Sequence, residues 1–479
     1  MPRPSCRRFL CCTVSSWLAS LLLPGCTPAP SGPPPQTLRL GPVSTVSATA
    51  ATLSLLDRVQ LWAGNGSLVL AYSEMRGPQE LLVVRCSTDG GASWVQPEPV
   101  RLSPQNQMET RHHAFQLAQL PDRALALLWW RRNMVSGSKA VFLSRSTDSG
   151  KSWTIGPQVD PGAESFLPSM AVARDGRVLI VCLDERTRRG RSDTGAIYKL
   201  YFNLSSDSGL TWKVQDRLLP LDAEFSDILG PTAAITGNSL LAVHFSRGGG
   251  GYAVRLARSE DEGRSWLHST LDSNRSLSYY GDFWVGSGGD RLAVVFCRGR
   301  NRQATLVYAS SADHGATWNK TTLNPSEKAA FGLPKVARSP QGVLAVAWES
   351  SEGDGFVPQV AFSRDGGTSW KPPVTVPTPP GRRPSFRLHP EIAFAEDGAL
   401  FVTWMDGPAL RQDIYVNRTT DLGRTWLSAA VRLNRGSPDT PDAWLPAVVG
   451  GAGGKAWVTW QERDSNQPGP LYLRMLSPP

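Results

Sequence analysis

The chain has few of the features that indicate a helical or a metal-binding protein. After residue 25, apolar residues do not recur at helical spacing over any long stretch, which favours an all-β fold. Seven cysteines are present, but beyond residue 26 only Cys86, Cys182 and Cys297 remain, without metal-ligand spacing. An odd number of cysteines at such positions predicts buried thiols within strands, and neither a metal nor a cofactor is expected.

Concentrated positive charge is also missing. The formal net charge is +9, and it falls to +6 when Arg3, Arg7 and Arg8 are removed with the N-terminal segment. Nucleic-acid-binding domains show a concentrated basic face. So mild an excess in so long a chain argues against a nucleic-acid partner.

The first 25 residues have the pattern of an export signal. Three arginines precede an apolar run from Phe9 to Leu23, which is too short to be a transmembrane helix. The stretch Leu23-Pro24-Gly25-Cys26 resembles a bacterial lipobox, which implies that Cys26 is lipidated. Residues 26–36 are rich in proline and predict a stiff tether. We therefore expect a membrane-anchored lipoprotein of the periplasm or cell surface, with ordinary cleavage and secretion as the alternative.

One octapeptide, Ser/Thr-x-Asp-x-Gly-x-Ser/Thr-Trp, occurs seven times, first at Ser87–Trp94. Its aspartates are Asp89, Asp148, Asp207, Asp261, Asp313, Asp365 and Asp421, at intervals of 59, 59, 54, 52, 52 and 56 residues. A near-constant period of this size indicates a solenoid or a propeller. Each copy predicts a turn between two strands, because the carboxylate can accept backbone N–H bonds and the glycine suits a positive φ.

The octapeptide is identified as the Asp-box, and the chain after about residue 50 resembles the Asp-box (bacterial neuraminidase repeat) proteins of the sialidase superfamily. The resemblance implies a β-propeller. It also implies that the seven aspartates are structural, because Asp-boxes lie away from the sialidase active site.

The blade count follows from the repeat length. The 440 residues from Thr37 to Leu476 correspond to about eight units, so 37–479 is expected to be one propeller domain of eight four-stranded antiparallel blades, with seven as the alternative. The last unit lacks an octapeptide, and Thr37–Ser44 is expected to supply its fourth strand. In the third repeat the predicted strands are Leu167–Ala173, Arg177–Leu183, Ile197–Leu204 and Trp212–Leu218.

Topology places the octapeptide turns on one face of such a propeller and the candidate site on the other. The starts of the first strands and the ends of the second strands surround the channel on that opposite face, and they are rich in arginine. Because arginine pairs bidentately with carboxylates, an acidic sugar is a reasonable ligand. The alternative is that these charges satisfy one another as salt bridges.

The family resemblance also implies roles for individual residues. Arg58-Val59-Gln60-Leu61, followed by Ala71–Arg76, resembles the family's opening repeat, in which Arg58 would be the first arginine of a carboxylate-binding triad and Arg76 a substrate-site arginine. Two features depart from the family: Gln60 replaces a proline, and the short loop after Arg76 lacks the acid/base aspartate.

The remaining members of such a site are assigned by position alone. Arg186 and Arg298 are candidates to complete the triad. Sialidases use a tyrosine nucleophile. Tyr279, Tyr280 and Tyr252 are candidates by position, with Glu164 or Glu224 as the partner, and Tyr280 with Glu164 is the preferred pair.

Three functions stay open at this point. The first is a propeller that recognises glycans without catalysis, the second a retaining exo-α-sialidase, and the third a scaffold for protein partners. The fold is argued from physical principles, whereas the function leans on analogy between folds, which is a weaker warrant.

Overall fold

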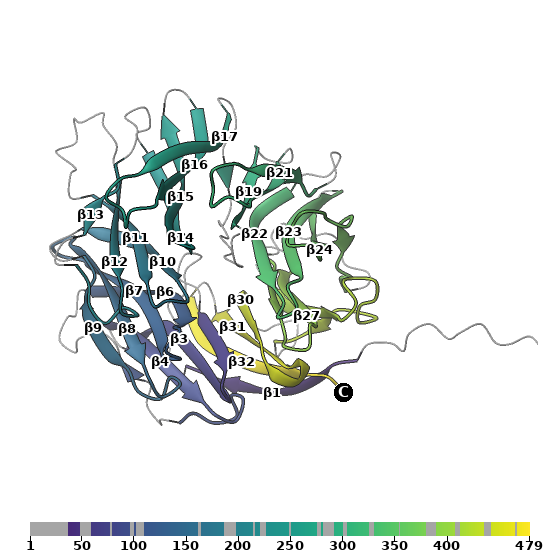
Figure 1. The fold of residues 1–479 in the computed structure, drawn as a ribbon. Helices are drawn as coiled ribbons and strands as arrows, with labels where there is room; N and C mark the ends of the chain where they lie inside the picture. The colour runs from purple at the N-terminus through teal and green to yellow at the C-terminus, as the bar shows by residue number, and fades with distance from the viewer. Residues whose placement is uncertain are drawn as a thin grey trace, which may run out of the picture. The chain divides into compact units, whose positions relative to one another are not determined.

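The fold is seen in a computed structural model (Figure 1). It describes residues 37–47, 59–76, 79–95, 100–101, 110–160, 164–185, 198–213, 216–220, 227–248, 251–274, 279–280, 292–299, 304–324, 330–353, 355–379, 389–407, 412–434, 442–464 and 467–479. The predicted signal segment 1–25, Cys26 and the tether 26–36 lie outside these residues and stay predictions. Among the described residues, no helix is long and apolar enough to cross a membrane.

The first four blades are four-stranded antiparallel sheets. Blade 1 contains β2 (Gln60–Gly64), β3 (Ser67–Arg76), β4 (Gln79–Ser87) and β5 (Val100–Arg101). Blade 2 contains β6 (Thr110–Gln119), β7 (Leu125–Asn133), β8 (Lys139–Ser146) and β9 (Thr154–Gln158). Blade 3 contains β10 (Ser165–Val172), β11 (Val178–Asp184), β12 (Lys199–Ser205) and β13 (Arg217–Leu218). Blade 4 contains β14 (Asp227–Thr236), β15 (Ser239–Gly248), β16 (Gly251–Ser259) and β17 (Leu267–Asn274).

The other four blades repeat this order. Blade 5 contains β18 (Tyr279–Tyr280), β19 (Leu292–Arg298), β20 (Thr305–Ser311) and β21 (Asn319–Thr322). Blade 6 contains β22 (Ala330–Arg338), β23 (Leu344–Glu352), β24 (Gly355–Ser363) and β25 (Val374–Thr375). Blade 7 contains β26 (Glu391–Phe394), β27 (Leu400–Asp406), β28 (Asp413–Thr419) and β29 (Val431–Arg432). Blade 8 contains β30 (Asp442–Gly450), β31 (Ala456–Asp464), β32 (Gln467–Ser477) and β1 (Arg39–Thr45), with a 3-10 turn, η2 (Ala452–Gly454), after β30.

Blade 8 is assembled from both ends of the described chain. Its first three strands are C-terminal, and β1 pairs antiparallel with β32, with Arg39 opposite Ser477 and Thr45 opposite Tyr472. The prediction that an N-terminal segment supplies the missing fourth strand is confirmed, and so is the count of eight blades.

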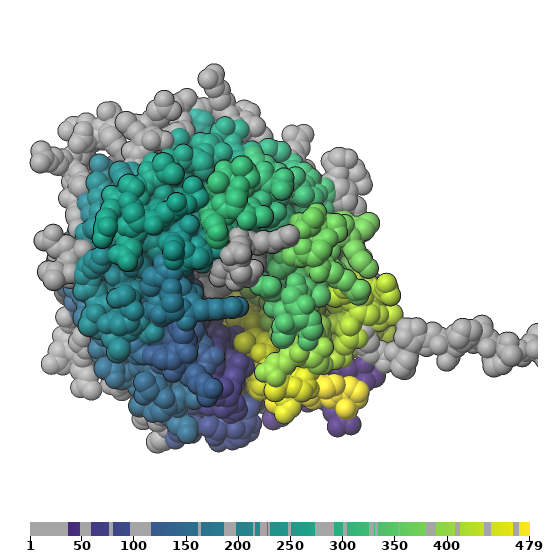
Figure 2. Space-filling view, viewed as in Figure 1, coloured from purple at the N-terminus to yellow at the C-terminus, as the bar shows by residue number. Residues whose placement is uncertain are grey.

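The hydrophobic core is divided among the seams between blades. Each cluster of buried side chains joins two neighbouring blades; Tyr72 of blade 1, for example, packs with Leu471 and Leu473 of blade 8. Central strands are therefore buried on both faces, as in β11, where every residue is buried. First strands such as β14, β22 and β30 lie nearest the centre (Figure 1), and neighbouring blades abut in the space-filling view (Figure 2).

Three tryptophans and the cysteines are buried within strands. Trp348, Trp404 and Trp460 are each 0% exposed and belong to clusters between blades, so they serve in packing. The three cysteines are buried in β4, β11 and β19.

The fourth strand of the third repeat is shorter than predicted. Its first ladder pair joins Arg217 to Phe202, and β13 contains only Arg217 and Leu218. Trp212, predicted to begin this strand, instead packs its ring against the cluster between blades 2 and 3. Packing of the indole thus takes precedence over strand pairing at this position.

Candidate functional site

The octapeptide turns share one hydrogen-bond pattern. In the first copy, Asp89 Oδ1 accepts bonds from Ser87 Oγ and the Ser93 N–H, both at 2.8 Å, while Ser93 Oγ donates to Asp89 Oδ2. The glycine two positions after the aspartate, Gly91, has a φ of +90° and donates its N–H to Ser87 Oγ at 2.7 Å. The carboxylate is thereby occupied by bonds within its own turn.

These bonds keep the turn carboxylates ionised. Donation from the side chain and then the backbone of Ser93 lowers the pKa of Asp89 from 3.8 to about 2. The equivalent bonds from Ser369 lower the pKa of Asp365 to about 2. Because each donor bond stabilises the charged form, the seven carboxylates are poorly suited to proton transfer near neutral pH.

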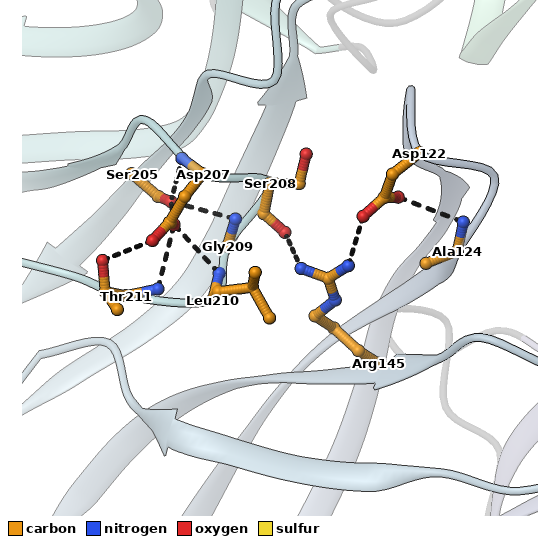
Figure 3. A network of polar contacts seen from close by, with 9 residues as sticks. All are labelled: Asp122, Ala124, Arg145, Ser205, Asp207, Ser208, Gly209, Leu210 and Thr211. Carbon is orange, nitrogen blue, oxygen red and sulfur yellow. Dashed lines mark hydrogen bonds and ion pairs between the residues drawn. The ribbon is translucent and has the colours of Figure 1, made fainter.

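Each turn also contacts the blade before it. A Cβ atom added to Gly150 would lie 2.4 Å from Val69 Cγ2 of blade 1, so the glycine allows close approach. In blade 2, the Arg145 guanidinium donates to the Ser208 carbonyl of the next turn at 2.7 Å and pairs with Asp122 (Figure 3). Gly90 and Gly366 occupy the equivalent position in their own turns. The Gly90 carbonyl accepts a bond from Trp457 Nε1, and the Gly366 carbonyl accepts one from the Tyr308 hydroxyl. This face, the turn face, therefore joins the blades.

The opposite face, which we call the channel rim, carries one polar residue per seam. At the end of each second strand, the residue two positions after a buried core side chain points toward the same seam, because side chains alternate along a strand. These eight positions are Glu74, Arg131, Asp184, Ser246, Arg298, Ser350, Asp406 and Glu462. Among them, Arg298 is the one that the sequence analysis names as a candidate, and the two-residue period identifies the others.

The eight positions form a ring around the channel, which we call the seam ring. Its carboxylates and guanidinium groups differ in exposure. Glu74, Asp184 and Asp406 are 1%, 0% and 4% exposed, whereas the Arg298 side chain is 35% exposed and Arg131 is half-buried. Glu462 is the one half-buried carboxylate of the ring, and it accepts a bond from Trp460 Nε1 at 3.1 Å. Most negative charge of the ring thus lies inside the seams, while its positive charge faces solvent.

Arg298 is held by a contact between blades 4 and 5. Its Nη1 lies 3.2 Å from Asp272 Oδ2 in β17, and Lys320 Nζ lies 3.4 Å from Asp272 Oδ1. Asp272 is 9% exposed, but Lys320 is 42% exposed. One half-buried and one exposed cation therefore share one buried carboxylate, which leaves a net positive charge around Asp272. Sequence reasoning missed Asp272 and Lys320, since nothing local marks outer-strand residues as partners of the next blade.

Glu164 lies at the seam between blades 2 and 3. Its Oε2 accepts the backbone N–H of Lys139 at 3.1 Å. The Lys139 ammonium pairs with Glu185 and lies 4.7 Å from the centre of the Phe166 ring. A carboxylate held in this way is fixed at the start of β8 and remains partly exposed.

The other predicted site residues are placed only in part. Arg58 and Arg186 lie outside the described residues. Arg76 ends β3, and Tyr280 of β18 pairs with Cys297 of β19, but the side chains of Arg76 and Tyr280 lie outside the described part of the structure. Tyr280 and Arg298 thus belong to neighbouring strands of blade 5, whereas Glu164 precedes blade 3. Their roles stay predictions.

Within the described ranges, no three histidine, cysteine, aspartate or glutamate side chains come together in a way that could hold a metal ion.

Comparison with known proteins yields structural similarity only. No family model matches the chain, and no curated protein matches it by sequence. Solved structures that resemble it include the intramolecular trans-sialidase from Ruminococcus gnavus, with 12% identity, 75% of this chain and 93% of that chain covered, and a TM-score of 0.39. The phage phi92 endosialidase has 11% identity, covers 92% and 69% of the two chains and scores 0.42.

A third similar structure is the Penicillium chrysogenum α-L-arabinanase, with 15% identity, 75% and 91% of the two chains covered and a TM-score of 0.38. At such identities and scores, resemblance does not extend to function. The described part of the chain is an eight-bladed β-propeller.

Proposed function

We propose that the protein is an exported propeller that recognises anionic glycans at the channel rim. The observation that carries this proposal is the difference in exposure within the seam ring, where three carboxylates are buried and the arginines reach solvent. Exposed arginine with its planar fork is suited to a sugar carboxylate.

The contact at Arg298 supports the same ligand class. Asp272 binds Nη1 and so orients the guanidinium, while the side chain stays 35% exposed. Lys320 adds a second cation beside it. An oriented cation pair loses less side-chain entropy when it binds an anion. Export and anchoring through a lipid on Cys26 belong to the proposal, and metabolic labelling with a palmitate analogue tests them.

The experiment is a titration of 3′-sialyllactose into purified protein, followed by saturation-transfer NMR. We expect saturable binding that Arg298→Ala weakens at least about tenfold, as for loss of a charged hydrogen-bond donor. Arg177→Ala is the matched control, because Arg177 pairs with Asp175 in a turn-face hairpin. Lactose should not compete. Equal loss in both variants, or displacement of bound sialyllactose by lactose, would contradict the proposal.

Catalysis as an exo-α-sialidase is the second candidate. It is favoured by one observation, the pairing of Tyr279 with Arg298 and of Tyr280 with Cys297 in blade 5. Release of free sialic acid during the titration, abolished by Tyr280→Phe with binding retained, would establish it. If neither sugar binds, the scaffold reading takes precedence.

A further inference from the structure

A pocket on the turn face lies opposite the channel rim and takes no part in the proposed site. Its volume is about 410 Å³, and it is lined by turns of blades 1, 7 and 8. This volume is within the range of small-molecule sites. We call it the turn-face pocket.

The floor of the pocket is apolar. Trp457 and Met475 of blade 8 form it together with Leu68 of blade 1. Trp457 Nε1 donates to the Gly90 carbonyl at 2.8 Å, which fixes the indole against the first octapeptide turn. Gly90 has a φ of +76°, and a Cβ atom there would lie 3.2 Å from Met475 Sδ, so only glycine keeps this wall open.

The walls carry both hydrogen-bond acceptors and donors. Glu396 offers a carboxylate, and Asn65 and Lys455 offer N–H groups, while Asp89 contributes its negative charge because its oxygens are bound within its own turn. Glu396 and Lys455 are both exposed. Within the described part of the chain, neither side chain has an ion-pair or hydrogen-bond partner, so both are available to a ligand.

The charge of the pocket selects against anions. Two carboxylates and one ammonium group give a net charge of about −1, opposite in sign to the exposed charge of the rim. A hydroxyl group both donates and accepts, so a polyol matches a wall of mixed carboxylate, amide and ammonium groups. The C–H surface of a sugar ring suits the indole and thioether floor.

We propose that the turn-face pocket binds a neutral saccharide unit, as a second ligand site separate from the channel rim. The proposal does not depend on anion recognition at the rim, because no rim residue lines the pocket.

The test uses the full chain and a panel of lactose, maltose, cellobiose and chitobiose, each titrated with saturation-transfer NMR. We expect saturable binding of at least one of them. The double variant Glu396→Gln/Lys455→Met should weaken it at least about tenfold. Ala452→Trp, which places a ring at the exposed pocket mouth, should abolish it. The matched control is Glu262→Gln/Lys371→Met, which removes one exposed acid and one exposed base elsewhere on the turn face.

The outcomes separate the two proposals. Arg298→Ala should leave neutral-sugar binding unchanged while it weakens sialyllactose binding. Binding that Arg298→Ala removes, binding that both pocket variants leave intact, or the absence of saturable binding to all four sugars would overturn the pocket proposal. A failure of sialyllactose alone would overturn only the function proposed for the rim.

Discussion

Asp160 and Asn324 perform the same structural task in blades 2 and 5. Asp160 Oδ1 accepts the Val141 N–H at 2.9 Å, and Asn324 Oδ1 accepts the Leu306 N–H at 2.7 Å. In both blades the preceding residue donates its own N–H to the same third strand. Asp160 is therefore an acid at a position where an amide suffices.

The surroundings of Asp160 disfavour its charge. Burial, with the negative charge of Asp216 as a smaller cause, raises the pKa of the carboxyl to about 7 against the hydrogen bond from the Val141 N–H. Asp160 is 1% exposed, and among the described residues its Oδ2 has no hydrogen-bond partner. In its protonated form it resembles the asparagine of blade 5.

Replacing Asp160 with asparagine should stabilise the protein above neutral pH. The folded state holds the proton to higher pH than the unfolded chain, so the free energy of unfolding falls as pH rises from about 4 to about 7. A shift from 3.8 to about 7 corresponds to at most about 4 kcal/mol. We expect Asp160→Asn to raise the free energy of unfolding by about 2 kcal/mol at pH 8 and by little at pH 4.

Urea unfolding at several pH values measures this gain. Asn324→Asp is the reciprocal variant and should introduce the same pH dependence into blade 5. Parallel pH profiles for wild type and Asp160→Asn would show that Asp160 ionises without penalty.

Octapeptide glycines should resist substitution where the preceding blade touches them. Gly150 has a φ of +91°, and an added Cβ atom would lie 2.4 Å from Val69 Cγ2. Gly150→Ala combines backbone strain with a clash and should destabilise by about 3 kcal/mol. Gly453 has a φ of +65° but nothing within 4 Å of an added Cβ atom, so Gly453→Ala should lose only about 1 kcal/mol. Thermal unfolding of both variants separates the cost of backbone strain from the cost of the clash. Equal losses of stability would mean that Val69 moves aside without cost.

The three thiols should be unreactive in the folded protein. Burial raises the pKa of Cys297 to about 12 and the pKa of Cys182 well above 9.0, and it also raises the pKa of Cys86. Since the thiolate is the reactive form, iodoacetamide at pH 8 should label these positions only after unfolding. Peptide mass spectrometry measures the labelling of each cysteine separately. Fast labelling of one cysteine in the native protein would contradict the prediction and would show that the blades around it separate transiently.

Asp272→Asn should separate stability from binding at the rim. Arg298 and Lys320 lose their shared counterion, which should lower the free energy of unfolding by about 1 kcal/mol. The positive charge left behind should strengthen sialyllactose binding, and more so at low ionic strength. Weaker binding would mean that orientation of Arg298 by Asp272 outweighs the gain in charge.

The architecture could be predicted from sequence because its signals are local. The bond pattern of Asp89 with Ser87 and Ser93 lies within seven residues, so the octapeptide marks every turn it forms. The interval between octapeptides then gives the length of one blade. The extra strand before the first repeat is the segment that completes the last blade.

Contacts between blades could not be predicted in the same way. Asp272 meets Arg298 across a seam, and Asp160 is buried by packing of blade 3 against blade 2. The turn-face pocket likewise combines residues of three blades. Such contacts depend on how whole sheets pack, which no short pattern records.

The pairing of β1 with β32 has a consequence for the order in which the protein forms. β1 is the first of the described strands to be synthesised, whereas its partner β32 (Gln467–Ser477) is the last of them. Earlier blades can form one by one as the chain emerges. The closing blade cannot form until β32 has been synthesised, and until then two unprotected sheet edges remain open to foreign strands. Synthesis that stalls before β32 therefore yields an open arc prone to aggregation, and completion of the last strand decides whether the molecule closes.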